Sequence, residues 1–406
     1  MDRKYRFKLL LCLLVALFIS SCGGSAPVQD FPQHITPTAT MIPSHDITVC
    51  ASGCDHATLQ EAIDASSTQP GMVISIEDPI HTEGDILLSK DVIIQGHGQD
   101  TTIIQAANSL DESTQRIFLI PDDVQAQIRY LTMRHGHPTT DELNSGGALR
   151  NHGDLILENV IIRDNHASAG GGILNDGTLA IRHSTITDNI AEGGGSNFAE
   201  CKTGGGMKIM TGSVIMQNTT ISSNQSKGKG GGVHIACLGE LQASNSTISG
   251  NISMEDGGGL YINGMASLTH CTITENLGTN GGGIVFQGSG EHDVIRGRLE
   301  YQHTLIANNH TRLEQYGTAD CLMGRNGEIT INLHNWVADG NCGAEYSGEI
   351  VLLPLSMNGG FSPTHLLPEA SPAIDLIPAD VCPLDMDQRG VPRIGDCEPG
   401  STESVP

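Results

Sequence analysis

An eleven-residue pattern of apolar and polar positions recurs six times between residues 155 and 309. Each copy has apolar residues at its first and third positions, a polar residue at the fifth, Ile at the eighth and Asn at the eleventh. The copies start at Leu155, Leu179, Val214, Leu241, Ala266 and Leu299. This alternation predicts short β-strands. Because one copy is too short to bury its own apolar face, the repeat predicts a solenoid of stacked coils.

Glycine and asparagine mark the corners expected of such coils. A glycine block precedes each copy, as at Gly230-Gly231-Gly232, and glycine tolerates the tight turn and close backbone approach that each coil repeats. The closing Asn of each copy is expected to adopt the left-handed conformation. Its side-chain amide is expected to form a ladder from coil to coil. These residues are Asn165, Asn189, Asn224, Asn251, Asn276 and Asn309.

The start of the repeats also has a recognisable pattern. Residues 57–65 place Leu59, Ala62 and Ile63 at helical spacing, which predicts a short helix over the open N-terminal end of the stack. The repeat resembles the right-handed parallel β-helix proteins of the pectin-lyase-like superfamily. It also resembles polymorphic outer-membrane protein repeats, which usually have Phe where this chain has Ile. The resemblance implies an all-β, single-stranded right-handed parallel β-helix over residues 47–350.

A second motif string follows the coils. It contains Asn-Gly-Gly at 358–360, Ser-Pro-Ala-Ile-Asp at 371–375 and Asp-Gln-Arg-Gly at 387–390. This string resembles the tail of choice-of-anchor Q domain proteins, a family without assigned chemistry. Its prolines exclude regular strands, so residues 351–406 are expected to form an irregular C-terminal cap. Asp375, Asp387 and Arg389 would tie its turns together, and the alternative is a ligand site of His365, Asp375 and Arg389.

The N-terminal sequence predicts that the protein is exported from the cytoplasm. Residues 1–21 combine basic residues, an apolar run and small residues, which is typical of a signal peptide. Cys22 stands where a bacterial lipoprotein carries its lipid, so we expect a lipid anchor in the bacterial membrane or at the cell surface. Ordinary secretory cleavage is the alternative. With the lipid on Cys22, residues 22–46 would be a flexible tether.

Cysteine spacing fits an oxidising compartment. Three pairs each bracket a short irregular segment: Cys50 with Cys54, Cys321 with Cys342, and Cys382 with Cys397. Cys201 with Cys237 is a weaker pairing across neighbouring coils. Cys271 aligns with small residues of the other copies, which favours a buried structural thiol over a nucleophile.

Charge restricts the partners. The chain has a formal net charge of −25, and only 3% of its residues are aromatic. Such a surface repels nucleic acid unless cations intervene. It is compatible with binding of neutral glycans, cationic surface proteins or calcium. Calcium would be bound by acidic residues near the turns, such as Asp164 and Asp188.

Candidate chemistry is sparse. Arg134 and His135 lie close in sequence to Asp141 and Glu142, and this group is the best catalytic candidate, although a solvated loop is the simpler interpretation. His183, His270 and His303 replace Asn at the fifth position of the repeat, which favours a hydrogen-bonding column over a metal site.

The function that these patterns favour is presentation of a binding or adhesion surface. A lipid-anchored β-helix would bind a carbohydrate or another surface macromolecule with its long outer face. One alternative is a carbohydrate-active enzyme, either a polysaccharide lyase or a hydrolase, for which a pair of carboxylates in one groove would be needed. The other alternative is a passive structural spacer.

Overall fold

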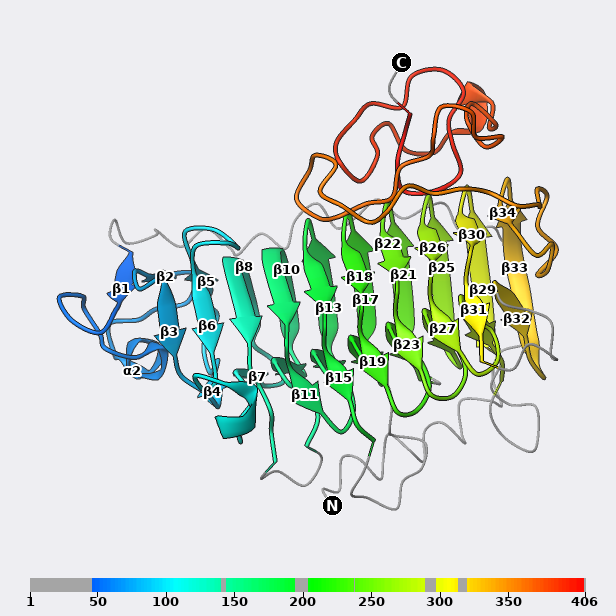
Figure 1. Cartoon of the computed structure of the whole chain (residues 1–406). Coiled ribbons are helices and arrows are strands. Elements are labelled where there is room, and N and C mark those ends of the chain that lie inside the picture. Colours follow the sequence, from blue (N-terminus) through cyan, green and yellow to red (C-terminus); the bar gives the residue numbers. More distant parts are fainter. Residues whose placement is uncertain are drawn as a thin grey trace, which may run out of the picture. The chain divides into compact units, whose positions relative to one another are not determined.

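The computed structural model describes residues 46–139, 144–193, 204–236, 238–288, 297–312 and 320–404. The chain winds into a right-handed parallel β-helix in which strands of successive coils lie side by side (Figure 1). All ladders between the named strands are parallel, as in the pairing of Leu157 with Ile181. The predicted fold class is confirmed.

Each complete coil has four walls. The long wall contains β1 (Ile47–Val49), β2 (Val73–Ile76), β5 (Ile93–Gln95), the first halves of β8 (Gln125–Arg134) and β10 (Asp154–Arg163), β13 (Thr178–Arg182), β17 (Ser213–Gln217), β21 (Glu240–Ser244), β25 (Met265–Thr269), β29 (Gly297–Gln302) and β33 (Gly327–Leu333). The side wall contains β3 (Ile80–Thr82), β6 (Ile103–Gln105), the second halves of β8 and β10, β14 (Thr185–Thr187), β18 (Thr220–Ser222), β22 (Thr247–Ser249), β26 (Thr272–Thr274), β30 (Leu305–Ala307) and β34 (Trp336–Val337).

The other two walls complete the coil. The short wall contains β11 (His166–Ala167), β15 (Ile190–Ala191), β19 (Gln225–Ser226), β23 (Ile252–Ser253), β27 (Leu277–Gly278) and β31 (His310–Thr311). The back wall contains β4 (Ile86–Leu87), β7 (Phe118–Ile120), β9 (Leu149–Asn151), β12 (Ile173–Asn175), β16 (Met207–Ile209), β20 (Val233–Ile235), β24 (Leu260–Ile262), β28 (Ile284–Phe286) and β32 (Cys321–Met323). Two 3-10 turns, η2 (Leu110–Glu112) and η5 (Ala379–Val381), lie outside the walls.

The third positions of the repeat form one interior file. Each of its residues is in register with the next, and none is more than 3% exposed. The file consists of Leu157, Ile181, Met216, Ala243, Leu268 and Tyr301. Stacking therefore buries the apolar residues of each coil against those of the next coil, away from water.

The closing asparagines form the expected ladder. Nδ2 of Asn165 donates to Oδ1 of Asn189 at 2.9 Å, and the later asparagines repeat this bond at 2.9–3.0 Å as far as Asn309. Asn309 donates in turn to Oδ1 of Asp320 at 2.9 Å. The same oxygens also accept from backbone N–H groups, as between Asn189 and Asn224 at 3.0 Å. The ladder thus satisfies buried polar groups in every coil.

The left-handed backbone does not lie at the closing asparagines, so that prediction was wrong. Positive φ occurs one residue earlier, at Asp164, Asp188, Ser223, Gly250, Glu275 and Asn308. It also occurs at the fifth position, between the long and side walls, at Asn159, His183, Asn218, Asn245, His270 and His303. The closing Asn must point its amide into the coil to reach the ladder. The residue before it therefore adopts the left-handed conformation of the turn.

The glycine blocks have the predicted role. Gly230 has φ of +68°, and a Cβ atom on Gly231 would lie 2.4 Å from the carbonyl oxygen of Gly258 in the next coil. The first glycine therefore supplies the turn, and the second allows two backbones to approach.

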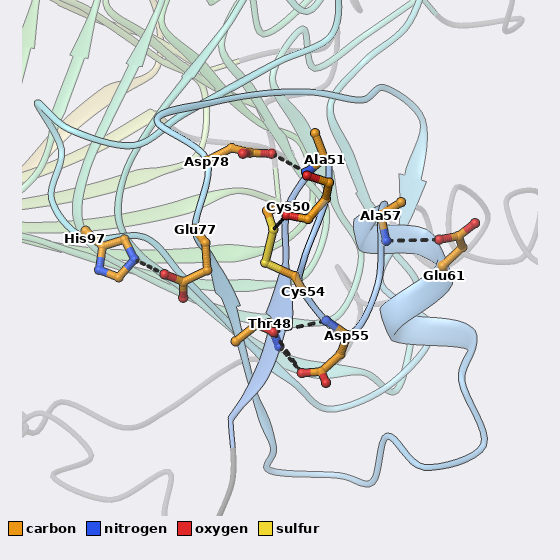
Figure 2. The surroundings of a disulfide bond; sticks show 11 residues. Thr48, Cys50, Ala51, Cys54, Asp55, Ala57, Glu61, Glu77, Asp78 and His97 are labelled. Atoms are coloured by element: carbon orange, nitrogen blue, oxygen red, sulfur yellow. Dashed lines mark hydrogen bonds and ion pairs between the residues drawn. A yellow bond between two sulfur atoms is a disulfide. The ribbon is translucent and has the colours of Figure 1, made fainter.

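A helix and a disulfide close the N-terminal end. Helix α2 (Leu59–Asp64) begins after Thr58, whose hydroxyl caps the backbone N–H of Glu61. Its residues Leu59, Ala62 and Ile63 are buried against the first coils, as predicted. Figure 2 shows the disulfide between Cys50 and Cys54 in the turn before this helix.

Two further disulfides join the pairs named from the sequence. Cys321 is bonded to Cys342, and this bond fastens residues 341–344 beside the last coil, where Cys342 and Ala344 pack against the core. Cys382 is bonded to Cys397. Cys201 and Cys237 lie outside the described residues. Cys271 is free and fully buried, and burial raises the pKa of its thiol to about 12, as suits a structural thiol.

The irregular C-terminal segment, residues 351–404, is called the tail here. It lies along the side wall, and its contacts span several coils rather than closing only the last one (Figure 1). Gln388 donates to the hydroxyl of Thr220 at 2.8 Å and accepts from that of Thr247 at 2.7 Å. Thr272 accepts from the backbone N–H of Ser401 at 2.9 Å. The tail thereby buries the outward hydroxyls of the side wall.

An ionic network holds the tail together. The fully buried Asp387 accepts from Nε of Arg389 at 2.8 Å and from the backbone N–H of Glu403 at 2.9 Å. Nη1 of Arg393 donates to the carboxylate of Glu403 at 2.8 Å. Asp375, which was expected to join the network, is exposed.

The ladder predicts that Asn224→Ala destabilises the fold by about 1–3 kcal/mol, because it removes the acceptor of two buried donors of Asn189. Urea denaturation would measure this change. Gln225→Ala, at the next and exposed position, is the control and should change the free energy of unfolding by less than about 0.5 kcal/mol. Equal stability of the two variants would contradict a supporting role for the ladder.

The tail predicts a loss of stability as pH rises from about 4.5 to about 8. Burial, followed by the neighbouring Glu398 carboxyl, raises the pKa of Glu403 from 4.5 to about 8. The folded state therefore holds this proton more tightly than the unfolded state, so the contribution is complete at low pH and disappears as pH rises through 8.

Thermal unfolding between about pH 4.5 and about 9 would test this expectation, with Glu398→Gln as the matched variant. The variant removes the second carboxyl and should flatten the decline in Tm. A wild-type Tm that stays constant across this range would contradict the raised pKa.

Candidate functional site

The structure describes two of the four catalytic candidates named from the sequence, Arg134 and His135. Arg134 lies on the side-wall half of β8, where its Nε and Nη2 donate to Oε1 of Gln105 at 3.0 and 2.8 Å. His135 follows at a left-handed corner, with Nδ1 at 3.1 Å from the carbonyl oxygen of Ala107. Asp141 and Glu142 lie outside the described residues. The described geometry therefore assembles no acid–base pair around Arg134.

Two histidines of the fifth position, His270 and His303, stack on each other instead of forming a hydrogen-bonded column, whereas the ring of His183 lies edge-on to that of Phe361. The ring of His303 lies 4.9 Å from that of His270 and 5.3 Å from that of His334. Burial, followed by the charges of His334 and Arg393, lowers the pKa of His303 to about 4. Burial also lowers the pKa of His270 well below its usual range, so His270 and His303 are neutral near pH 7. Their stacking explains why His replaces Asn at these two corners.

A polar cluster on the back wall was missed by the sequence analysis. Lys208, His234 and Tyr261 follow one another on the outward side of β16, β20 and β24. Nζ of Lys208 lies 3.4 Å from Nδ1 of His234, whose ring lies 5.2 Å from that of Tyr261. The signal was present, because each of the three follows the apolar residue after a glycine block.

Tyr261 is held by two donors. Nζ of Lys229 lies 2.7 Å and Nε2 of Gln287 lies 2.5 Å from its phenol oxygen. Lysine, histidine and tyrosine are residue types that transfer protons in enzymes. Here, however, Lys208, His234 and Tyr261 are at most 4% exposed. Burial, followed by the charge of Lys208, lowers the pKa of His234 well below its usual range and keeps it neutral. The cluster is closed to a large substrate.

The outward face of the long wall is the accessible surface. In each coil from β13 onward, alternate residues of the strand face outward and lie in register with those of the next coil. The column next to the side wall is formed by Arg182, Gln217, Ser244, Thr269 and Gln302. Its amides and hydroxyls are half-buried, which holds them in place while leaving them open to a ligand.

Apolar residues of the tail border this column. The ring of Phe361 lies 5.2 Å from that of His183, and the backbone oxygen of Met386 accepts from Nδ2 of Asn245 at 2.7 Å. The side chains of Phe361 and Met386 are 52% and 49% exposed. Their contact residues lie two coils apart, which corresponds to about 10 Å. The edge of the long wall thus combines apolar side chains with amides and hydroxyls.

Within the described ranges, no three His, Cys, Asp or Glu side chains approach closely enough to hold a metal ion. In the same ranges, no helix is long and apolar enough to cross a membrane.

Comparison with known proteins adds little. No protein-family model and no curated protein matches the chain. Among solved structures, a pectin methylesterase from carrot is similar to this chain, with a TM-score of 0.35 and 13% identity, over 72% of this chain and 90% of that one. So distant a likeness carries no functional argument, and the fold rests on the strand pairing described above.

The back-wall cluster predicts that Tyr261→Phe lowers the free energy of unfolding by about 1–2 kcal/mol, because two donors lose their acceptor. Urea denaturation would measure the change, with Tyr130→Phe at a 37% exposed side chain as control. Unchanged stability of Tyr261→Phe would show that the phenol oxygen has no structural role.

Proposed function

We propose that this protein is a lipid-anchored protein of a bacterial surface that binds a polysaccharide along its long wall. The observation that carries the proposal is the edge of the long wall, where half-buried amides and hydroxyls adjoin the exposed Phe361 and Met386. Binding sites for sugars need apolar faces for the ring and a few fixed polar groups for the hydroxyls.

The cellular location of the protein is part of the same proposal. Cys22 would carry the lipid, and residues 22–46 would hold the β-helix away from the membrane. The three disulfides support a compartment that is oxidising. The resemblance of the tail to choice-of-anchor Q domains supports attachment to a surface, although its contacts in this chain lie along the side wall. A surface protein as partner and calcium as cofactor stay predictions.

The second candidate function is a carbohydrate-active enzyme, which the cluster of Lys208, His234 and Tyr261 favours by its residue types. The burial of this cluster makes it the weaker candidate. Assays for reducing sugars and unsaturated uronates, with and without calcium, would decide. Turnover that is lost in a folded Tyr261→Phe variant would replace the binding proposal by catalysis.

The proposal predicts that the purified chain binds at least one insoluble or immobilised polysaccharide in a panel. Phe361→Ala should weaken this binding by about tenfold, because a stacked aromatic ring contributes about 0.5–1.5 kcal/mol beyond its buried area. Met254→Ala removes a 52% exposed side chain distant in sequence from the tail and should leave binding unchanged. Affinity electrophoresis would measure all three proteins. Equal binding by wild type and Phe361→Ala would place the site elsewhere.

A further inference from the structure

Two arginines lie in register on neighbouring side-wall strands. Arg134 on β8 pairs with Arg163 on β10, and Gln105 on β6 pairs with Arg134 on the other side. Like charges directly opposite each other on adjacent strands repel. The arrangement is therefore unfavourable unless an anion lies between or beside the two guanidinium groups.

The described residues supply only one such anion. Arg163 forms an ion pair with Asp164, the next residue in the chain. Within the described ranges, Arg134 has no carboxylate at ion-pairing distance, and its bonds go to the neutral Gln105. Burial, followed by the charge of Arg163, lowers the pKa of Arg134, as expected for two cations held together. Asp164 acts on Arg134 in the opposite direction but is bonded to Arg163, so the two arginines share one carboxylate.

The guanidinium of Arg134 is also held in a fixed orientation. Both of its bonds end on Oε1 of Gln105, whose Nε2 donates to the hydroxyl of Thr82 at 3.0 Å and to the side chain of Asn108 at 3.3 Å. A guanidinium has five N–H donors, so three remain for a ligand. Arg163 keeps a third of its side chain exposed, at 34%. A ligand can therefore reach the pair from solvent.

We propose that Arg134 and Arg163 form an oxyanion-binding site on the side wall. The planar fork of a guanidinium fits two oxygens of a carboxylate, a sulfate or a phosphate. The chain has a net charge of −25 and therefore repels anions over most of its surface. Anions are expected to bind only where arginines cluster. The ligand is either the carboxylate of an acidic sugar residue or a free inorganic oxyanion. The site is distinct from the long-wall surface and does not depend on it.

Isothermal titration of the full chain with trigalacturonate and, separately, with sodium sulfate would test the site. Both probes should bind more weakly as ionic strength rises. Each single change, Arg134→Gln or Arg163→Gln, should weaken binding roughly tenfold, because it removes a charged hydrogen-bonded pair. Arg298→Gln, which removes an exposed arginine from the long wall, should leave binding unchanged.

Further measurements separate a local effect from a folding defect. Arg134→Lys keeps the charge but loses the fork, so it should bind more weakly than wild type and more tightly than Arg134→Gln. In the wild type, sulfate should compete with trigalacturonate, whereas the neutral cellotriose should neither bind nor compete. Binding of trigalacturonate alone would assign the site to acidic sugars, and binding of sulfate alone to inorganic oxyanions.

Two results would overturn the proposal. One is the absence of saturable binding of either probe to the wild type. The other is equal binding by the wild type and a folded Arg134→Gln, Arg163→Gln double variant. Neither result bears on the long wall, because the Phe361→Ala comparison uses polysaccharides and a different surface.

Discussion

The interaction on which the whole stack depends is the hydrogen bond between closing asparagines of successive coils. Every amide in the ladder both accepts from the preceding coil and donates to the next, so no coil can shift in register without leaving buried donors unpaired. A chain of such bonds has a direction and needs an acceptor at its end. Asp320 supplies that acceptor, because a carboxylate accepts without having to donate.

The tail explains a second regularity of the coils. The side-wall strands β18, β22 and β26 have Thr or Ser on both sides of a buried Ile, which would suit a solvated surface. In the folded protein these residues are buried, and the hydroxyls of Thr220, Thr247 and Thr272 bond to tail residues such as Gln388 and Ser401. Small β-branched side chains allow the tail to lie flat, and their hydroxyls pair with its polar groups.

Sequence reasoning reached the fold because each coil repeats a local signal. Alternation, glycine blocks and closing Asn depend on neighbours within about 25 residues, so stacking follows from pattern alone. The position of the tail did not follow, because Gln388 meets Thr220 across 168 residues without any periodic signal. The back-wall cluster was missed for a related reason. Lys208, His234 and Tyr261 are adjacent only once the coils are aligned, and their burial was not readable from residue type.

The tail network also shows what burial of charge does in this protein. Asp387, Glu398 and Glu403 face Arg389 and Arg393 in nearly dry surroundings, so ionisation of all five would leave one excess negative charge. Retaining a proton between Glu398 and Glu403 removes this excess, and the raised pKa of Glu403 has that cause in addition to burial. Buried ion pairs add little net stability compared with apolar packing. In this protein the ion pairs instead fix the position of the tail. The tail is irregular, and its charged groups find their partners in one arrangement along the side wall.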